Sequence, residues 1–347
     1  MGGGLGTRPP LTARLPVLLL GAWTALVGVA YCSTPLRLDS LRTFVLAPQW
    51  RDTTPGGILA ALARAGAGAA GLGLLLLAFL GWGRPVRRWI GGRLPAPLGG
   101  HVRFLAGQAA CAFVVIGLGQ VGLLHAPLLQ LLAAGGVVRG LDALRRPPAG
   151  GARDAPDRMV RALRAAAGLA VATALAGALA PQIHYDALIY YQARPLAALH
   201  AHRFAIQTFV PKDGYPQAFE HLLILAFSLH ARFPVKLLPW LSFVAALLLI
   251  DDWLAPTGAS RRSRALAGAV FATLPLSTLL PSIGNNDCAV VHAAVAGAWL
   301  VRRRARRAAG FVAGWLLALK YSAAMLAVPL GVLAAPARLG GAALVAG

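Results

Sequence analysis

Long apolar runs alternate with short basic segments along the whole chain. Most runs are about 17 to 25 residues long, enough for an α-helix to cross a hydrocarbon core of roughly 30 Å with its backbone hydrogen bonds satisfied internally. The pattern predicts an all-α, polytopic integral membrane protein of about nine transmembrane helices. We place these spans at residues 15–32, 57–80, 103–122, 125–138, 162–181, 237–253, 264–282, 288–301 and 309–334.

Composition supports a bilayer as the surrounding phase. Hydrophobic residues make up 58% of the 347 positions and charged residues only 13%. The formal net charge of +22 would indicate nucleic acid in a soluble protein. Here the basic residues are almost all arginines in the short segments between apolar runs, which is typical of membrane topology signals. We therefore expect the lipid bilayer as a partner and no nucleic acid.

The basic segments orient the chain in the cytoplasmic membrane. Segments 81–103, 139–164, 261–264 and 302–307 are rich in arginine, so the positive-inside rule makes them cytoplasmic. Counting outward from 139–164 puts residues 182–233 on the outer face.

One apolar stretch in that outer region, 217–232, is expected to lie along the membrane surface as an interfacial helix. It is short and carries Glu220, His221 and His230. The following spans then bring Asp186, Glu220 and Asp287 to the same extracytoplasmic side.

The other acids of the basic segments are expected to be solvated interfacial charges. They are Asp142, Asp154, Asp157, Asp251 and Asp252.

Three outer carboxylates could carry chemistry, and each also has a simpler interpretation. Asp186 could act as a general base, or could be a helix-start carboxylate stabilised by the helix dipole. Glu220 could bind a metal or a donor, or could face outward from an amphipathic surface helix. Asp287 could do the same, or could cap the helix that starts there. Together the three would suffice to bind a divalent cation, Mg²⁺ or Mn²⁺, and to deprotonate a hydroxyl.

Basic residues near these acids are candidates for binding phosphate. Lys320 is the one basic residue well inside a predicted span, where a charge is costly unless it is paired or hydrated. It could bind phosphate, or its side chain could extend to the outer interface. Arg194 and Arg203 are further phosphate candidates. The histidines of the region have no spacing typical of a zinc site.

Four other residues are candidates for positioning a substrate. Tyr190 lies four residues after Asp186, on the same face if that segment is helical. The full set is Tyr190, Tyr191, Tyr321 and Asn286.

Four segments, taken in order, carry a resemblance to a known family. They read HYDALIYYQARPLAAL, YPQAFEHLLILAFSL, LPLSTLLPSIGNNDCAVVHAAVAGAWLV and GFVAGWLLALKYSAAML. Over roughly residues 165–335 the chain resembles the GT-C glycosyltransferases, in particular bacterial membrane proteins similar to protein O-mannosyltransferases and to the aminoarabinose transferase of lipid A.

The resemblance implies a role for several residues. Asp186 matches the catalytic aspartate of the first outer loop, Glu220 an acidic position for metal or donor binding, and Asp287 the acid of the second loop. Lys320 and Tyr321 match a Lys-Tyr pair of related sequences. The family implies a polyprenyl-phosphate sugar donor, inverting transfer and often a divalent cation. It also implies two parts: residues 1–160 with about four transmembrane helices, and 161–347 as a catalytic core expected to be incomplete at its C-terminus, with the outer loop 182–233.

The leading functional hypothesis is a membrane glycosyltransferase that transfers sugar from a polyprenyl-phosphate donor to a hydroxyl of a glycan, lipid or protein outside the cytoplasm. Two alternatives remain open. One is a multi-pass transporter or lipid flippase, and the other is a non-catalytic membrane subunit. Transporters place polar groups near the bilayer midplane on broken helices, whereas here the acids are predicted at one interface.

Overall fold

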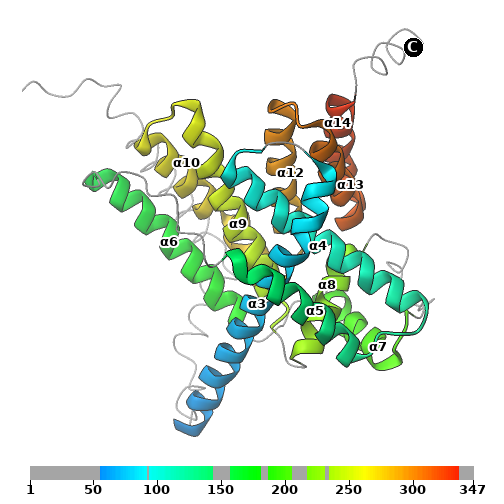
Figure 1. The fold of residues 1–347 in the computed structure, drawn as a ribbon. Coiled ribbons are helices and arrows are strands. Elements are labelled where there is room, and N and C mark those ends of the chain that lie inside the picture. The colour runs from blue at the N-terminus through cyan, green and yellow to red at the C-terminus, as the bar shows by residue number, and fades with distance from the viewer. Residues whose placement is uncertain are drawn as a thin grey trace, which may run out of the picture.

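The protein is described by a computed structural model over residues 55–91, 94–143, 157–180, 187–204, 217–230 and 234–335. Within these ranges the secondary structure is helical and contains no strand, so the all-α prediction is confirmed. Figure 1 shows the arrangement. The α-helices are α3 Pro55–Ile90, α4 Ala96–Gln120, α5 Ala126–Gly140, α6 Arg158–Leu179, α7 Arg194–Ala201, α8 Ala218–Leu229, α9 Leu237–Leu254, α10 Arg261–Thr273, α11 Pro275–Ile283, α12 Asp287–Arg302, α13 Arg306–Leu319 and α14 Ala324–Ala334. Short helical turns are η2 Leu141–Ala143, η3 Ala187–Ala193, η4 Ala255–Thr257 and η5 Tyr321–Ala323.

Four of these helices are long and apolar enough to cross a membrane. They are α3, α4, α6 and α9, and they coincide with the spans predicted at 57–80, 103–122, 162–181 and 237–253. Helices α10 and α11 together form a fifth candidate that is bent by 51°. The bend falls at Leu274, whose φ of −56° and ψ of 131° leave the helical region as expected for a residue before proline. A membrane-associated helical protein is therefore supported, with four or five candidate spans in the described residues.

The remaining predicted spans do not appear as full-length helices. Helix α5 has 15 residues and α12 has 16, so their lengths of about 22 Å and 24 Å fall short of a hydrocarbon core of roughly 30 Å. The span predicted at 309–334 is interrupted between α13 and α14 at Lys320. The segment predicted as loop 81–103 is mostly helix, because α3 continues to Ile90 and α4 begins at Ala96. The span at 15–32 lies outside the described residues.

Helix α3 packs directly on α4 and α5 through glycines. A Cβ atom on Gly83 would overlap the backbone carbonyl of Arg103 in α4, and one on Gly81 would overlap that of Gly136 in α5. Small residues let helix backbones approach this closely, which is how helices associate in lipid.

The prediction of solvated charge is wrong for Asp142, because Arg84 and Arg103 donate to its two carboxylate oxygens at 3.1 and 2.7 Å.

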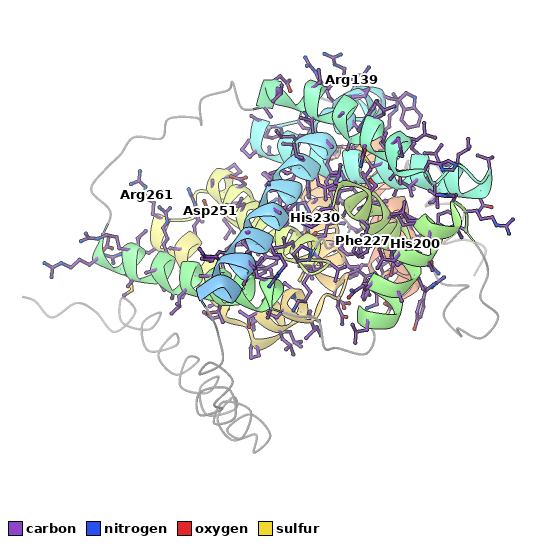
Figure 2. All side chains as sticks on the ribbon, turned by 90° about the horizontal axis from the view of Figure 1, so that it is seen from below. Arg139, His200, Phe227, His230, Asp251 and Arg261 are labelled. Atoms are coloured by element: carbon purple, nitrogen blue, oxygen red, sulfur yellow. The ribbon has the colours of Figure 1, made fainter. Side chains whose placement is uncertain are left out.

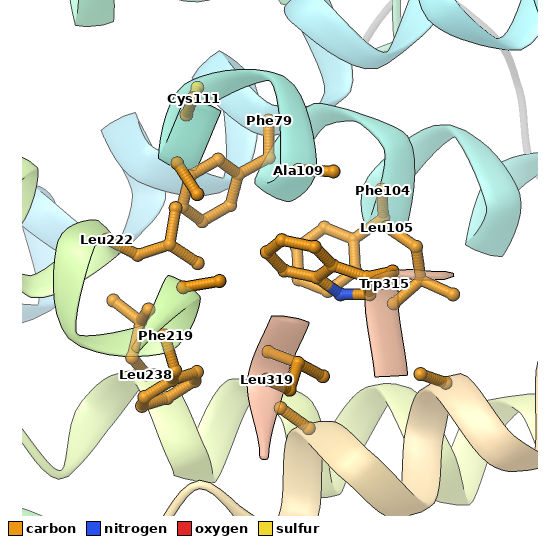
Figure 3. Close-up of a cluster of buried hydrophobic side chains, with 14 of the residues drawn as sticks. Phe79, Phe104, Leu105, Ala109, Cys111, Phe219, Leu222, Leu238, Trp315 and Leu319 are labelled. Carbon is orange, nitrogen blue, oxygen red and sulfur yellow. The ribbon is translucent and has the colours of Figure 1, made fainter. Parts of the chain in front are cut away.

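Helix α8 lies in the middle of the hydrophobic core, although it was expected at the membrane surface. Ten of its twelve residues are buried, and it packs against α4, α5 and α7. Figure 3 shows Leu222 of α8 beside Phe79 of α3, and Phe219 of α8 beside Leu238 of α9, in the same buried cluster as Phe104 and Trp315. In Figure 2 Phe227 and His230, at the end of α8, project onto the middle of the molecule. The prediction of an interfacial helix is wrong here because the stretch is apolar on all sides and only its first turn is charged.

Helix α6 lies along one side of the molecule, at the left of Figure 1, and packs against α10 and α11. Asp157 caps its first turn by accepting from the Met159 N–H at 3.1 Å and also pairs with Arg262 of α10. The arginine is the main reason that the pKa of Asp157 is lowered. Arg264 donates both guanidinium bonds to Asp251, at 2.9 and 3.0 Å, near the end of α9 where Asp251 and Arg261 are marked in Figure 2.

The predicted boundary between residues 160 and 161 remains a prediction. The helices on its two sides share one core, since α8 packs on α4 and α5.

Candidate functional site

Lys320 interrupts what would otherwise be one long apolar helix. Helix α13 ends at Leu319, and Lys320 has an extended backbone with φ −161° and ψ 134°. Its ammonium group donates to Asp287 Oδ1 at 2.7 Å, and both side chains are about one-third exposed. Asp287 is the first residue of α12, so one ion pair joins the break between α13 and α14 to the start of α12. Leaving the helix lets the lysine reach a counter-charge, which is how a charge in an apolar helical segment becomes tolerable.

Asn286 strengthens the same junction from the other chain segment. It is only 3% exposed, and its side-chain amide donates to the carbonyl of Leu319 at 3.0 Å. That carbonyl belongs to the end of α13, where backbone acceptors lack helical partners. The Asn286 side-chain oxygen is buried without a hydrogen-bond donor among the described residues. Asn286 thus stabilises the end of α13 at the helix break, and its own side-chain oxygen remains a buried acceptor beside the break.

Glu220 is buried in the first turn of α8 and is 8% exposed. Burial raises the pKa of its carboxyl group to about 7, while a backbone hydrogen bond and the positive charges of Arg194 and Lys320 partly oppose the rise. One carboxyl oxygen has no hydrogen-bond partner in the described part of the chain. The alternative of an outward-facing residue on a surface helix is therefore excluded. Glu220 lies instead within the electrostatic reach of two candidate phosphate ligands.

Arg194 approaches Glu220 from a third segment. It is the first residue of α7 and follows the wide π-helical turn η3, in which the chain passes from residue 187 to 193. Its charge also acts on the neighbouring His221, whose pKa is lowered to about 4, mainly by burial and secondarily by Arg194. Arg194, Glu220, Asp287 and Lys320 thus form a cluster of alternating charge, which we call the α8–α12 charge cluster. The cluster thus brings together four residues that are spread over positions 194 to 320 of the sequence.

Other predicted site residues lie elsewhere or outside the described residues. Tyr191 is 9% exposed and packs its ring edge-on against Phe219 at 6.4 Å, so it is part of the core. Tyr321 is 58% exposed beside Lys320. Asp186 and the side chain of Tyr190 fall outside the described residues, so their roles remain predictions.

Arg203 does not join the α8–α12 charge cluster. The Arg203 side chain is exposed. The residues on either side of it bind the end of α4 and the turn that follows: the Leu124 N–H donates to the His202 carbonyl at 2.9 Å, and the Phe204 N–H donates to the Gly119 carbonyl at 3.2 Å. The charges acting on Glu220 are those of Arg194 and Lys320.

The carboxylates of the charge cluster do not by themselves make a metal site. Among the described residues no three His, Cys, Asp or Glu side chains lie close enough to hold a metal ion. Asp287 already pairs with the Lys320 ammonium through Oδ1, so part of its charge is neutralised. A divalent ion at this place would need further oxygen ligands, such as water molecules or the side-chain oxygen of Asn286, which is unpartnered among the described residues.

A second polar chain was missed from the sequence. His101 of α4 bridges His292 of α12, at 3.0 Å, and Asp252 of α9, at 3.2 Å. His292 is 1% exposed, so the chain runs from a partly exposed carboxylate into the core. His292 lies 191 positions and Asp252 lies 151 positions from His101 in the sequence, and hydrophobic periodicity cannot predict contacts between residues so far apart. The available signal was His292 inside the apolar run 288–301, since polar residues in such runs usually have partners, whereas His101 lay in the predicted loop 81–103.

Comparison of the chain with models of known protein families, with curated proteins and with solved structures gives no match.

Proposed function

We propose that the protein is a membrane glycosyltransferase that transfers a sugar from a polyprenyl-phosphate donor to an acceptor hydroxyl on the extracytoplasmic face of the cytoplasmic membrane. The observation that carries the proposal is the α8–α12 charge cluster: two basic side chains and two acids from four separate segments, inside an otherwise apolar helical assembly. A lipid-linked phosphate needs an anion site with apolar surroundings. The resemblance of residues 165–335 to GT-C enzymes points the same way.

The cluster supplies cations for the donor phosphate. The Lys320 ammonium group has three donors, and the Asp287 contact engages one of them. Arg194 offers a planar guanidinium that matches phosphate oxygens. Both charges already act on Glu220, so a phosphate bound here would have two cations within reach.

In the proposed reaction Asp186 takes the proton from the acceptor hydroxyl. The resulting oxygen nucleophile attacks the anomeric carbon from the face opposite the phosphate, and the bond between that carbon and the phosphate oxygen breaks. The phosphate leaves as an anion stabilised by Lys320 and Arg194, and the anomeric configuration is inverted. A divalent cation, where used, would add Lewis-acid stabilisation of the same leaving group.

The test uses membranes that contain the full chain, a polyprenyl-phosphate sugar donor and measurement of sugar transfer. Asp186→Asn is expected to lower kcat at least about 100-fold, the lower end of general-base contributions, with little change in donor KM. Lys320→Gln is expected to raise donor KM. Arg261→Gln, an exposed change outside the cluster, is the control for charge loss and should leave both parameters unchanged. Full activity of Asp186→Asn at equal protein level would overturn the proposal.

A second candidate, a transporter or lipid flippase, is favoured by one observation. Two apolar segments are broken, at Leu274 and at Lys320, and the second break carries the ion pair with Asp287. Broken helices with polar groups at the break are typical of transporter binding sites. Reconstituted vesicles that translocate a lipid-linked sugar without transferring it would favour this alternative. Transfer that depends on Asp186 would favour the enzyme.

A further inference from the structure

A pocket lies at the opposite end of α12 from the charge cluster. It is lined by Trp253, Pro256, Thr257, Trp299, Arg302 and Arg303, and its volume is about 170 Å³. That exceeds several-fold the volume of roughly 30 Å³ that one water molecule takes in the liquid. Helix α12 separates the pocket from Asp287 by 15 residues, or about 22 Å. It is therefore distinct from the proposed catalytic site.

The walls combine aromatic rings with two arginines. Trp253 and Trp299 stack with their ring centroids 6.4 Å apart and their planes inclined by 14°. Trp299 is 1% exposed, whereas Arg302 and Arg303 are exposed. A tryptophan buried to this degree is fixed by core packing and is not a freely lipid-exposed interfacial ring.

The positive charge of the pocket is not neutralised from within the described part of the protein. Arg302 and Arg303 make no ion pair and no side-chain hydrogen bond there. The nearest acids in sequence on α9 are engaged elsewhere, because Asp251 binds Arg264 and Asp252 binds His101. Within the described ranges Arg302 and Arg303 thus have no counter-charge.

The end of α12 does not present bare carbonyls to the pocket. Arg304 adopts a left-handed backbone with φ 56°, Ala305 N–H donates to Leu300 O at 2.9 Å, and Arg304 N–H donates to Val301 O at 2.9 Å. These two bonds close the helix end in the Schellman pattern and satisfy the carbonyls of Leu300 and Val301. Favourable interaction of arginine with a helix C-terminus explains basic residues here. It does not explain why they border a cavity with two stacked tryptophans.

We propose that this pocket binds the phosphate headgroup of an anionic membrane lipid. Guanidinium groups bind phosphate oxygens in a planar, two-bond geometry. The Thr257 hydroxyl of the pocket already donates to Leu254 O at 2.7 Å. The pocket lies at the end of the candidate span Leu237–Thr257, where the membrane interface is expected. The basic segment 302–307 is predicted to face the cytoplasm, where anionic lipids attract arginines.

The test uses the purified full chain in a neutral detergent and thermal unfolding as the readout. Short-chain phosphatidylglycerol is titrated against short-chain phosphatidylcholine at equal concentration, with inorganic phosphate as a third arm. We expect saturable stabilisation by phosphatidylglycerol alone. The double variant Arg302→Gln, Arg303→Gln should weaken the apparent affinity at least tenfold.

The matched control is the double variant Arg306→Gln, Arg307→Gln, which removes the same charge from the same basic segment outside the pocket. It should stay within twofold of the wild type. Equal weakening in both variants would reduce the effect to general charge attraction and overturn the proposal. Equal stabilisation by inorganic phosphate would overturn the lipid as the source of the phosphate group. Trp253→Leu should also weaken binding while leaving the arginines in place, and unchanged affinity there would overturn the role of the pocket.

Discussion

Helices α3, α4 and α5 pack backbone against backbone through glycines, whereas the segment from α10 to α14 is interrupted at Leu274 and at Lys320. In the first region contacts depend on the absence of side chains. In the second, apolar helices are broken where polar side chains must find partners, as Lys320 finds Asp287. We therefore expect the first region to be a rigid support, and the broken helices of the second to depend on contacts between polar side chains. The predictions below test that division.

The largest expected effect comes from Gly83→Ala in α3. The added methyl group would overlap the Arg103 carbonyl, and a backbone atom cannot move aside as a side chain can. We expect a loss of at least about 3 kcal/mol, the upper range for overpacking. The measurement is the yield of monodisperse protein after detergent extraction, together with its thermal midpoint. A wild-type midpoint would show that the glycine contact is not needed.

The next prediction concerns Glu220→Gln in α8, which removes the buried acid on which Lys320 of the second region acts. Since the carboxyl pKa is about 7 in the folded protein against 4.5 ordinarily, the folded state keeps a proton that the unfolded state loses between those pH values. Stability should therefore fall as pH rises through this window, by roughly 3 kcal/mol, and stay lower above it. The glutamine variant should lose this dependence and unfold at a higher temperature than the wild type at pH 8.

The control for this pH profile is Asp157→Asn. The pKa of Asp157 is lowered from 3.8, so its contribution changes only at more acidic pH. In that variant the fall in stability between pH 4.5 and pH 7 should be the same as in the wild type. A Glu220→Gln profile parallel to the wild type would contradict the buried position of Glu220.

A smaller effect is expected from the ion pair at the helix break. Asp287→Asn and Lys320→Gln should each cost about 2 kcal/mol, between the values for buried and for surface pairs, because both groups are about one-third exposed. The double variant should cost less than the sum, giving a coupling energy of about 1 kcal/mol in a thermodynamic cycle. Exact additivity would mean that the two charges do not interact in solution.

The smallest effect is expected from Gly73→Ala, on the same helix as Gly83. No atom lies within 4 Å of the added methyl group, so only backbone propensity changes. A gain of about 0.5 kcal/mol is expected. Thermal unfolding of this variant beside Gly83→Ala separates packing from propensity with an identical substitution. A loss comparable to that of Gly83→Ala would contradict the assignment of rigid support to the α3–α4–α5 contacts.

The sequence predicted the helical class and four of the spans, because long apolar runs have few other solutions. It also named Glu220, Asp287, Lys320 and Arg194 as site candidates, which the structure brings together. The helix break at Lys320 was not predicted, since the surrounding run is apolar and the counter-charge lies 33 positions away. The central place of α8 was also missed. A short apolar stretch has the same pattern at a membrane surface and in a protein core, and only its neighbours distinguish the two.

The buried position of α8 has a consequence for biosynthesis. Helices α4 and α5 pack against a segment that begins at residue 218, well after their own C-terminal ends at residues 120 and 140. While the ribosome is still translating the intervening residues, those helices carry an apolar face that nothing in their own segment covers. The nascent chain must keep that face in lipid or against an insertase until α8 arrives. Packing around α4 and α5 is therefore completed only after residues 218–229 have been translated.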